Sequence, residues 1–519
     1  MGKLRLTKLA CIVFAFCGAA VIASHAQTLT TLHSFAGYPT DGANPWAGLV
    51  QATDGNLYGT TAAGGVNNDG TVFEITAGGT LTMLYSFCFQ PSCTDGGFPA
   101  AGLVQATNGK FYGTTGDGGT YGDGTVFEIT AGGKLTTLYS FCSQTNCTDG
   151  AIPIDELIQA TDGNFYGTTT YGGTNYGGTV FEITAGGKLS TLYRFCSQPN
   201  CTDGSYPWAG LVQATDGRFY GTTSEGGVNG TAYGTVFEVT PTGTLTTLYS
   251  FCSQPNCADG YGPSAGLIQA TDGNFYGTTS YGGAKGVGSV FKITAGGTLT
   301  TLYSFCSQPN CADGSYPQAG LVQATDGNFY GTTYQGGSGT ACTYRGEVIG
   351  CGTIFSLAVG LGPFVETLPT SGKVGKTVKI LGNNLTGTTS VSFNGTAATF
   401  TVVSSSEIVT TVPAGATTGR VTVVTPAGTL NSNVVFLVTP QISGFTPTSG
   451  PVGTVVTITG AGLTQTSAVT FGGAKATQFT IISDTEVQAT VPTRARTGHI
   501  ATLTPAGTAM SSSTFTVTE

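Results

Sequence analysis

Charged residues and histidines are scarce in this sequence. Only 9% of the 519 residues are Asp, Glu, Lys or Arg, and there are three His and two Trp. A disordered chain needs high charge and few aromatics, and a coiled coil needs about half its residues from Ala, Glu, Lys, Leu and Arg, so both classes are excluded. Gly is abundant, with 82 residues, and aromatics make up 10%. This composition favours many short strands joined by tight turns, and the length allows roughly three domains.

Residues 1–26 have the pattern of a cleavable signal peptide. A positively charged start, with Lys3, Arg5 and Lys8, precedes an apolar run over 9–22, and Ser24-His25-Ala26 supplies small residues before the cleavage point. The run is shorter than the roughly 20 residues that span a bilayer, which argues against an uncleaved anchor. No later stretch is long enough to be a transmembrane helix. We therefore expect a secreted, extracellular protein, and association with the cell surface stays open.

Cleavage after Ala26 leaves an acidic chain. It removes three of the 18 Lys plus Arg and none of the 27 Asp plus Glu, so 15 positive residues face 27 negative ones and the net charge is −12. Nucleic-acid binding depends on cationic contacts to phosphate, so this class of partner is excluded. Only His33 and His499 remain, which excludes a two-His metal site or a His-based triad within one domain. No cofactor or metal is expected.

Three phrases recur six times along the first two thirds of the chain. G-L-V-Q-A-T-D-G-N-L-Y-G-T-T begins at Gly48, and its copies follow at intervals of 54 or 56 residues. The second phrase, G-T-V-F-E-I-T, begins at Gly70, and the third, T-L-T-T-L-Y-S-F, begins in its earliest form at Thr28. Each repeat thus contains four segments rich in Val, Ile, Thr, Tyr and Phe, and a D-G or A-G-G turn separates the members of each pair.

Four antiparallel strands repeated radially make a β-propeller. The sequence therefore predicts an all-β fold with a six-bladed β-propeller over 28–362. A β-solenoid is the alternative, but its coils are usually shorter than 54 residues. The chain enters with a fourth-strand phrase at 28–35, and no such phrase follows the sixth repeat. We infer that residues 28–35 supply the outer strand of the sixth blade and close the ring.

The repeated phrases resemble the Gloeo/Verruco ("GloVer") tandem repeat of secreted bacterial proteins. The resemblance covers about residues 28–360 and recurs with little drift. It implies an extracytoplasmic, β-structured repeat protein. It supplies no activity and no catalytic residues that could be carried over to this chain.

A different duplication follows the repeats. P-T-S-G-K-V-G begins at Pro369 and P-T-S-G-P-V-G at Pro447, with later landmarks such as Phe393 and Phe471 also 78 residues apart. About seven short β segments in such a unit predict two immunoglobulin-like β-sandwich domains, 363–440 and 441–519. The pattern resembles IPT/TIG domains, which implies either an extracellular spacer or interaction module, or a DNA-contacting module as in some transcription factors. The leader and the acidic charge favour the extracellular role.

Twelve cysteines remain after cleavage, and an even count in a secreted chain indicates disulfides. Five C-x4-C pairs follow the fourth strands, and a sixth pair lies in an insertion of the last repeat. Local pairing is the simplest connectivity, because every repeat that has one of the two cysteines has both. The predicted disulfides are Cys88–Cys93, Cys142–Cys147, Cys196–Cys201, Cys252–Cys257, Cys306–Cys311 and Cys342–Cys351.

The long connections of the repeats are predicted to share one face of the ring, and we call it the long-loop face. Loops on a rigid scaffold commonly carry function. Tyr and Trp combine a flat apolar face with a polar edge, which suits stacking on sugar rings. The candidate ligand-binding residues are Trp46, Tyr121, Tyr171, Tyr176, Tyr206, Trp208, Tyr233, Tyr281, Tyr316 and Tyr334. The two Trp could instead be wedges between blades, and both interpretations stay open.

These observations predict a secreted, non-enzymatic binding or adhesion protein, monomeric, that recognises carbohydrate, either an extracellular polysaccharide or a cell-surface glycan. One alternative is an extracellular polysaccharide-active enzyme, since paired carboxylates can hydrolyse glycosides. Its candidate acids are Asp155 and Glu156, which depart from the repeat consensus, with Asp117 and Glu225 in nearby loops. A purely structural surface or matrix protein is the other alternative. No catalytic residue is assigned.

Overall fold

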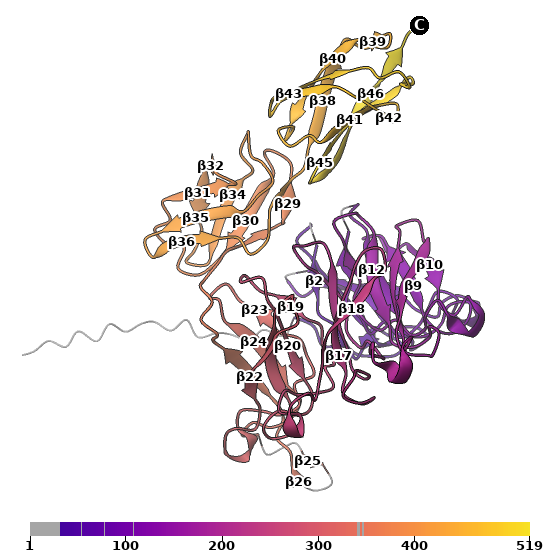
Figure 1. Ribbon diagram of the computed structural model, residues 1–519, viewed down its shortest axis with the longest axis vertical. Coiled ribbons are helices and arrows are strands. Elements are labelled where there is room, and N and C mark those ends of the chain that lie inside the picture. Colours follow the sequence, from indigo (N-terminus) through magenta and orange to yellow (C-terminus); the bar gives the residue numbers. More distant parts are fainter. Residues whose placement is uncertain (1–31, 53, 77, 107, 340–342, 345–346) are drawn as a thin grey trace, which may run out of the picture.

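The computed structural model describes residues 32–339 except 53, 77 and 107, then 343–344 and 347–519. The predicted signal peptide lies outside these residues. The described chain is built from strands, with five 3-10 turns as its only helical elements. Within this part of the chain, no helix is long and apolar enough to cross a membrane. The expectation of an all-β fold is confirmed: repeated sheets stand in a propeller-like arrangement and two sandwiches follow them (Figure 1).

Each repeat forms one antiparallel sheet in which the strands lie in chain order. Five sheets have four strands and the sixth has three among the described residues. Their strands are β2(Val50–Gln51), β3(Leu57–Thr61), β5(Thr71–Ile75) and β6(Leu81–Ser86); β7(Val104–Gln105), β8(Phe111–Thr115), β9(Thr125–Ile129) and β10(Leu135–Ser140); β11(Ile158–Gln159), β12(Phe165–Thr169), β13(Thr179–Ile183) and β14(Leu189–Arg194); β15(Val212–Gln213), β16(Phe219–Thr223), β17(Thr235–Val239) and β18(Leu245–Ser250); β19(Ile268–Gln269), β20(Phe275–Thr279), β21(Ser289–Ile293) and β22(Leu299–Ser304); and β23(Val322–Gln323), β24(Phe329–Thr333) and β27(Thr353–Leu357).

Two further two-stranded sheets lie in loops. They pair β1(Gly42–Ala43) with β4(Ala63–Gly64) and β25(Thr343–Tyr344) with β26(Glu347–Val348).

The repeated glycine in the second strand of each sheet has a steric reason. In β8, a Cβ built on Gly113 would lie 2.7 Å from Cζ of Phe127 and 2.9 Å from a methyl carbon of Leu103. Any side chain there would displace the Phe ring of the neighbouring strand β9. The phrase F-Y-G-T-T therefore packs tightly because its central residue has no side chain.

Aromatic rings join each repeat to the next. Tyr166 of β12 stacks on Phe219 of β16 at 4.1 Å, and Phe195 meets Phe237 edge-on at 5.0 Å. Both arrangements recur at equivalent positions in other repeats, and the rings are fully buried. Stacked and edge-on aromatic pairs add about 0.5–1.5 kcal/mol each beyond the area they bury. The hydrophobic cores consequently lie between neighbouring sheets.

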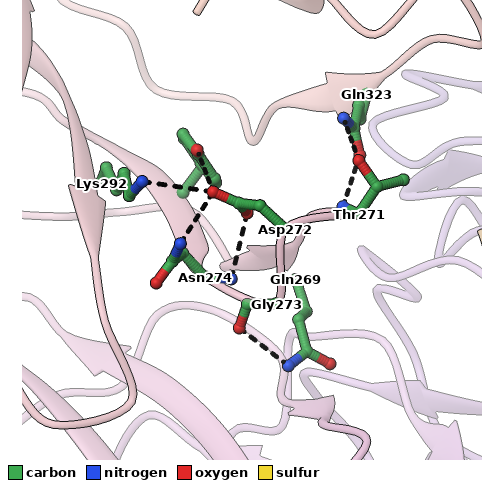
Figure 2. Close-up of polar contacts among 8 residues, drawn as sticks. Gln269, Thr271, Asp272, Gly273, Asn274, Lys292 and Gln323 are labelled. Atoms are coloured by element: carbon green, nitrogen blue, oxygen red, sulfur yellow. Dashed lines mark hydrogen bonds and ion pairs between the residues drawn. The ribbon is translucent and has the colours of Figure 1, made fainter. Parts of the chain in front are cut away.

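The tight D-G turns are held by their own aspartates, as the turn interpretation predicts. Asp272 accepts hydrogen bonds from the backbone N–H and the side-chain amide of Asn274, and it forms an ion pair with Lys292 (Figure 2). Burial alone would raise the pKa of Asp272, but these donors and the Tyr276 hydroxyl hold it below its ordinary value. Across the sheet boundary, the side chain of Gln323 exchanges two hydrogen bonds with Thr271 (Figure 2).

The loops after the fourth strands are closed by disulfides and by a buried aspartate. In the third repeat, Asp203 accepts hydrogen bonds from the Tyr193 hydroxyl at 2.8 Å, from the Ser197 N–H and hydroxyl, and from the Gln198 N–H. The 3-10 turns of these loops are η1(Pro91–Cys93), η2(Thr145–Cys147), η3(Pro199–Cys201), η4(Pro255–Cys257) and η5(Pro309–Cys311). The bonded cysteines are Cys88–Cys93, Cys142–Cys147, Cys196–Cys201, Cys252–Cys257 and Cys306–Cys311. Cys351 is also disulfide-bonded, and Cys342 lies outside the described residues.

The N-terminal segment contacts the first sheet in the way that the segment at the end of each fourth strand contacts the next sheet. Phe35 meets Phe73 edge-on at 5.3 Å, as Phe87 meets Phe127 at 5.2 Å. Nε2 of His33 is 2.9 Å from Oδ2 of Asp41. At the equivalent place in complete repeats, a Tyr hydroxyl donates a hydrogen bond to a buried Asp. Residues 32–35 are not in a strand, and β27 has no outer partner among the described residues. Ring closure by residues 28–35 therefore stays a prediction.

The duplicated C-terminal units are sandwiches of two sheets, as expected for immunoglobulin-like domains. In the first, the sheets are β28(Glu366–Leu368)-β30(Thr377–Leu381)-β34(Glu407–Thr411)-β33(Phe400–Val402) and β32(Thr396–Ala398)-β31(Ser390–Phe393)-β35(Val421–Thr425)-β36(Gly428–Asn431), with β29(Ser371–Gly372) parallel to β37(Leu437–Val438). In the second, they are β38(Gln441–Thr446)-β40(Val455–Ala461)-β44(Glu486–Thr490)-β43(Phe479–Ser483) and β39(Ser449–Gly450)-β46(Gly507–Val517)-β45(Gly498–Thr504)-β41(Ala468–Phe471)-β42(Ala474–Lys475). Each encloses one apolar core.

Hydrogen bonds join the sandwiches to each other and to the sixth sheet. The side-chain amide of Gln465 bonds both the N–H and the C=O of Thr418, so one residue links the two sandwiches. Thr325 accepts from the N–H of Phe364 and from the amide of Asn383, which ties the first sandwich to the repeats.

Candidate functional site

The two long connections of neighbouring repeats lie together on the long-loop face. The segment that leaves a fourth strand forms an isolated bridge with the loop between the second and third strands of the next sheet, as between Ser205 and Glu225 or Tyr261 and Tyr281. Tyr206 has a left-handed φ of 55°. Its N–H donates to the carbonyl of Gly177 and its own carbonyl accepts from the N–H of Ser224. The ladder therefore fixes the backbone from which the aromatic side chains project.

Five aromatic side chains from the third to fifth repeats line one open cavity of about 760 Å³. We call it the aromatic cavity. Its lining residues are Tyr171, Tyr206, Trp208, Ser224, Glu225, Ala232, Tyr261, Gly262, Ser264, Ser280, Tyr281 and Gln318.

The rings of the aromatic cavity support one another. Tyr171 meets Tyr206 edge-on at 5.4 Å, and Tyr261 stacks on Tyr281 at 5.4 Å with 20° between the planes. Trp208 is 46% exposed, and Tyr171 and Tyr281 are also exposed. These rings thus combine a fixed orientation with an accessible face.

Hydroxyl and amide groups stand among the rings. The hydroxyls of Ser264 and Ser280 are 2.7 Å apart, and that of Ser224 donates to the carbonyl of Tyr206. Glu225 is the one charged residue that lines the cavity within the part of the chain that the structure describes, and it is exposed. Ser264, Ser280 and Gln318 were not singled out from the sequence. Ser264 and Gln318 occupy the repeat position of Trp46 and Trp208, which is the signal that could have identified them.

The other predicted aromatics lie in several places. Tyr233 and Tyr316 contact rings of the aromatic cavity, Tyr261 and Tyr281 respectively. Trp46 lies edge-on to Phe98 at 5.2 Å and is 66% exposed, so it is not a buried wedge. Tyr121, Tyr176 and Tyr334 are exposed but do not line the aromatic cavity.

A second cavity, of about 450 Å³, is lined by the same three consecutive positions of five repeats and by the first and third of these positions, Gln318 and Gly320, in the sixth. We call it the axial cavity. Five repeats contribute Gly at the third position, and the third repeat contributes Glu156. Trp208, Ser264 and Gln318 line both cavities, so the two are neighbours.

Among the described residues, Asp155 and Glu156 are the only charged ones that line the axial cavity. Burial raises the pKa of Asp155 to about 7; a hydrogen bond with the Thr168 side chain opposes this rise, and the charge of Glu156 adds to it. Glu156 is exposed within the cavity, and partial desolvation by the cavity walls raises its pKa. Oδ2 of Asp155 is buried and has no hydrogen-bond partner among the described residues. Glu156 likewise has no hydrogen bond or ion pair within that part of the chain.

The arrangement defines a class of protein, namely a β-structured tandem-repeat protein with appended immunoglobulin-like modules. The chain belongs to the Gloeobacter/Verrucomicrobia repeat family, whose model matches residues 18–160 and 143–345. The IPT/TIG domain model matches residues 364–438 and 440–518. Both resemblances expected from the sequence are thereby confirmed. No curated protein matches the chain.

Solved structures give weak likenesses. One is SGBP-B from a complex xyloglucan utilization locus in Bacteroides uniformis, at 24% identity and TM-score 0.16, covering 29% of this chain and 48% of that one. Another is a surface glycan-binding protein from Prevotella bryantii, at 19% identity and TM-score 0.22, covering 31% and 40%. The matched part thus spans less than half the length of either protein. A fungal alcohol oxidase in complex with copper matches at 12% identity and TM-score 0.37, covering 92% and 98%.

Proposed function

We propose that this chain is a secreted, non-enzymatic carbohydrate-binding protein and that the aromatic cavity holds its ligand, a neutral polysaccharide. The observation that carries the proposal is the meeting of five aromatic rings from three repeats in one open cavity. In this proposal residues 1–26 are the leader, 28–362 the binding domain, and 363–440 and 441–519 spacers that hold it away from its attachment.

The chemistry of the lining favours sugar rings. Tyr and Trp faces cover the C–H faces of a pyranose, while hydroxyls such as Ser264 and the amide of Gln318 can exchange hydrogen bonds with its hydroxyl groups. Mutual ring contacts hold the aromatics in place before a ligand arrives, so little side-chain entropy is lost on binding.

The charge of the cavity supports a neutral ligand. Of the residues that the structure describes, Glu225 is the one charged residue that lines this cavity, and none of the lining residues is Lys or Arg. A uronate or a sulfated sugar would meet a like charge there without a cation to compensate. A neutral sugar can instead donate hydroxyl hydrogen bonds to the carboxylate.

The test compares Trp208→Ala and Tyr281→Ala with Tyr121→Ala, an exposed aromatic outside the cavity. A glycan array with the purified protein identifies a ligand, and calorimetry then measures its affinity for each variant. We expect the first two substitutions to weaken binding about tenfold each, since a lost aromatic contact is worth roughly 1 kcal/mol or more. Tyr121→Ala should bind like the parent. Equal affinity in all four proteins, or loss of binding only together with unfolding, would refute the proposal.

A polysaccharide hydrolase is the second candidate, and the raised pKa of Asp155 favours it. A carboxyl group with a pKa near 7 beside a second carboxyl group is the pattern of a general acid. Release of reducing ends from a bound polymer, abolished by Glu156→Gln, would support this candidate over pure binding.

A further inference from the structure

The axial cavity takes one variable side chain from each repeat. In every repeat, the residue that follows the proline of the long connection lines this cavity. We call this place the variable position, and its six members are Trp46, Ala100, Ile154, Trp208, Ser264 and Gln318. The proline is constant while the side chain after it differs, so the variable position sets the chemistry of the cavity. Two of its members, from the first and fourth repeats, are indole rings.

The backbone on both sides of the variable position is fixed in the fourth repeat. A Cβ built on Gly178 would lie 2.6 Å from Cδ of Pro207, so the proline packs directly on the preceding repeat. The carbonyl of Ala209 accepts a hydrogen bond from the Thr168 hydroxyl at 3.2 Å. Trp208 stands between these two contacts and is 46% exposed. Its backbone is therefore ordered before a ligand arrives, which lowers the entropy cost of binding to its ring.

The axial cavity continues the aromatic cavity. Three members of the variable position, Trp208, Ser264 and Gln318, line both cavities. Trp46 lies beyond them, in the lining of the axial cavity but not in that of the aromatic cavity. Its ring meets Phe98 edge-on at 5.2 Å, and Trp46 is 66% exposed, so the indole is both supported and accessible. A ligand that covers the tyrosines of the aromatic cavity and Trp208 can therefore extend to a second indole.

The remaining lining of the axial cavity suits a sugar residue. It consists largely of Ala, Gly, Ile and Leu, which offer C–H surface, with the amide of Gln318 and the hydroxyl of Ser264 as hydrogen-bonding groups. The exposed carboxylate of Glu156 can accept hydrogen bonds from sugar hydroxyls, and its charge disfavours an anionic sugar. The two cavities, of about 760 and 450 Å³, each have the size of a small-molecule site, so a ligand that fills both is an oligomer.

We infer, resting on the proposed carbohydrate binding, that the axial cavity is a second sugar subsite and that one polysaccharide chain spans it and the aromatic cavity. In this arrangement Trp208 covers one sugar residue and Trp46 covers another residue further along the same chain. Covalently linked residues reach the second subsite at a high effective concentration, so contact there raises the affinity. The protein therefore selects long, linear, neutral chains over the corresponding disaccharides.

The two Trp of the chain give each part of this site its own fluorescent reporter. Trp46→Phe leaves Trp208, which lines both cavities, and Trp208→Phe leaves Trp46, which reports on the axial cavity. Phe keeps an aromatic face at either place. The full-length variants are titrated with neutral β-1,4-linked gluco-, xylo- and manno-oligosaccharides, from disaccharide to octasaccharide. We expect the shortest chains that bind to change the emission of Trp208, and long chains to change the emission of both.

Calorimetry with the same oligosaccharides measures the affinities. Trp46→Ala should weaken binding of the octasaccharide at least tenfold more than binding of the shortest chain, whereas Tyr281→Ala, in the aromatic cavity, should weaken both alike. Tyr121→Ala changes an exposed ring outside both cavities and is the matched control, which should bind every chain like the parent. Circular dichroism and melting temperature check that the fold is retained.

Three results would overturn the second subsite and leave the proposed carbohydrate binding in place. They are a constant emission of Trp46 while the octasaccharide changes that of Trp208, a response of Trp46 to the disaccharide as large as that to the octasaccharide, and an equal effect of Trp46→Ala on chains of every length. If the parent binds none of these oligosaccharides, the subsite is also refuted, and the glycan array decides separately whether the proposed function stands.

Discussion

The outer edge of the sixth sheet allows a quantitative test of ring closure. Ile354 of β27 is 84% exposed, whereas Val290, its counterpart in the fifth repeat, is fully buried under β22. A groove of about 440 Å³ runs along this edge and includes Ile354, Phe355 and Leu357. If residues 28–35 form the missing strand, they cover this groove and bury Ile354.

The expected free energies follow from these exposures. Burying one Ile side chain contributes about 2–3 kcal/mol, and the contact of Phe35 with Phe73 adds about 1 kcal/mol. Deleting residues 28–35 should therefore destabilise the repeat domain by about 3–4 kcal/mol. This lowers its melting temperature by roughly 4–6 °C, since a domain of this size has an unfolding entropy of about 0.7 kcal/mol/K.

A double-mutant cycle separates closure from a general effect of truncation. Ile354→Ala should cost about 2–4 kcal/mol in the parent, as for a buried Ile, and less than about 0.5 kcal/mol once residues 28–35 are deleted. Val290→Ala is the control, because β22 covers it in both backgrounds. Denaturant unfolding is measured for the parent, the deletion, Ile354→Ala in each of these backgrounds, and the two Val290→Ala controls. The four main proteins give the coupling free energy between Ile354 and residues 28–35. An equal cost of Ile354→Ala with and without the segment would refute closure by residues 28–35.

Three further predictions concern the axial cavity, the disulfide loops and the strand glycines. Replacing Asp155 by Ala, its counterpart in other repeats, should stabilise the protein at pH 8 by about 2–4 kcal/mol but not at pH 4. The folded pKa lies above the unfolded value, so the parent loses stability as pH rises from about 4 to 7, and urea unfolding at both pH values measures this. Asp203→Ala should cost about 1–3 kcal/mol by removing the buried acceptor of four hydrogen bonds, and Asp203→Asn less; an unchanged urea midpoint for Asp203→Ala would contradict a stabilising role of this network. Gly113→Ala should cost about 1–3 kcal/mol through its clash with Phe127, whereas Gly48→Ala, where a Cβ meets nothing within 4 Å and φ is not left-handed, is the control and should cost little.

The repeated phrases by themselves determined the sheets. Strand positions follow from local alternation of Val, Phe, Tyr and Thr, and from D-G turns whose aspartate bonds its own backbone, as Asp272 does. Each sheet buries the same residues against the next, so one repeat predicts the others. The duplication around Pro369 and Pro447 likewise predicted two sandwiches, because each unit encloses its own core.

Only the tertiary structure decided which of the candidate side chains meet. Tyr171, Trp208 and Tyr281 come from three repeats, and their neighbours Tyr121 and Tyr334 carry the same chemistry but lie outside the aromatic cavity. The direction of a loop side chain depends on the β-bridge to the following repeat and on the backbone φ of the residue itself, as at Tyr206. Neither is encoded in the repeated phrases. Glu156 was visible as a departure from the consensus. That Glu156 lines the axial cavity follows from the convergence of six repeats on one cavity, which brings together residues as distant as Gly48 and Gly320.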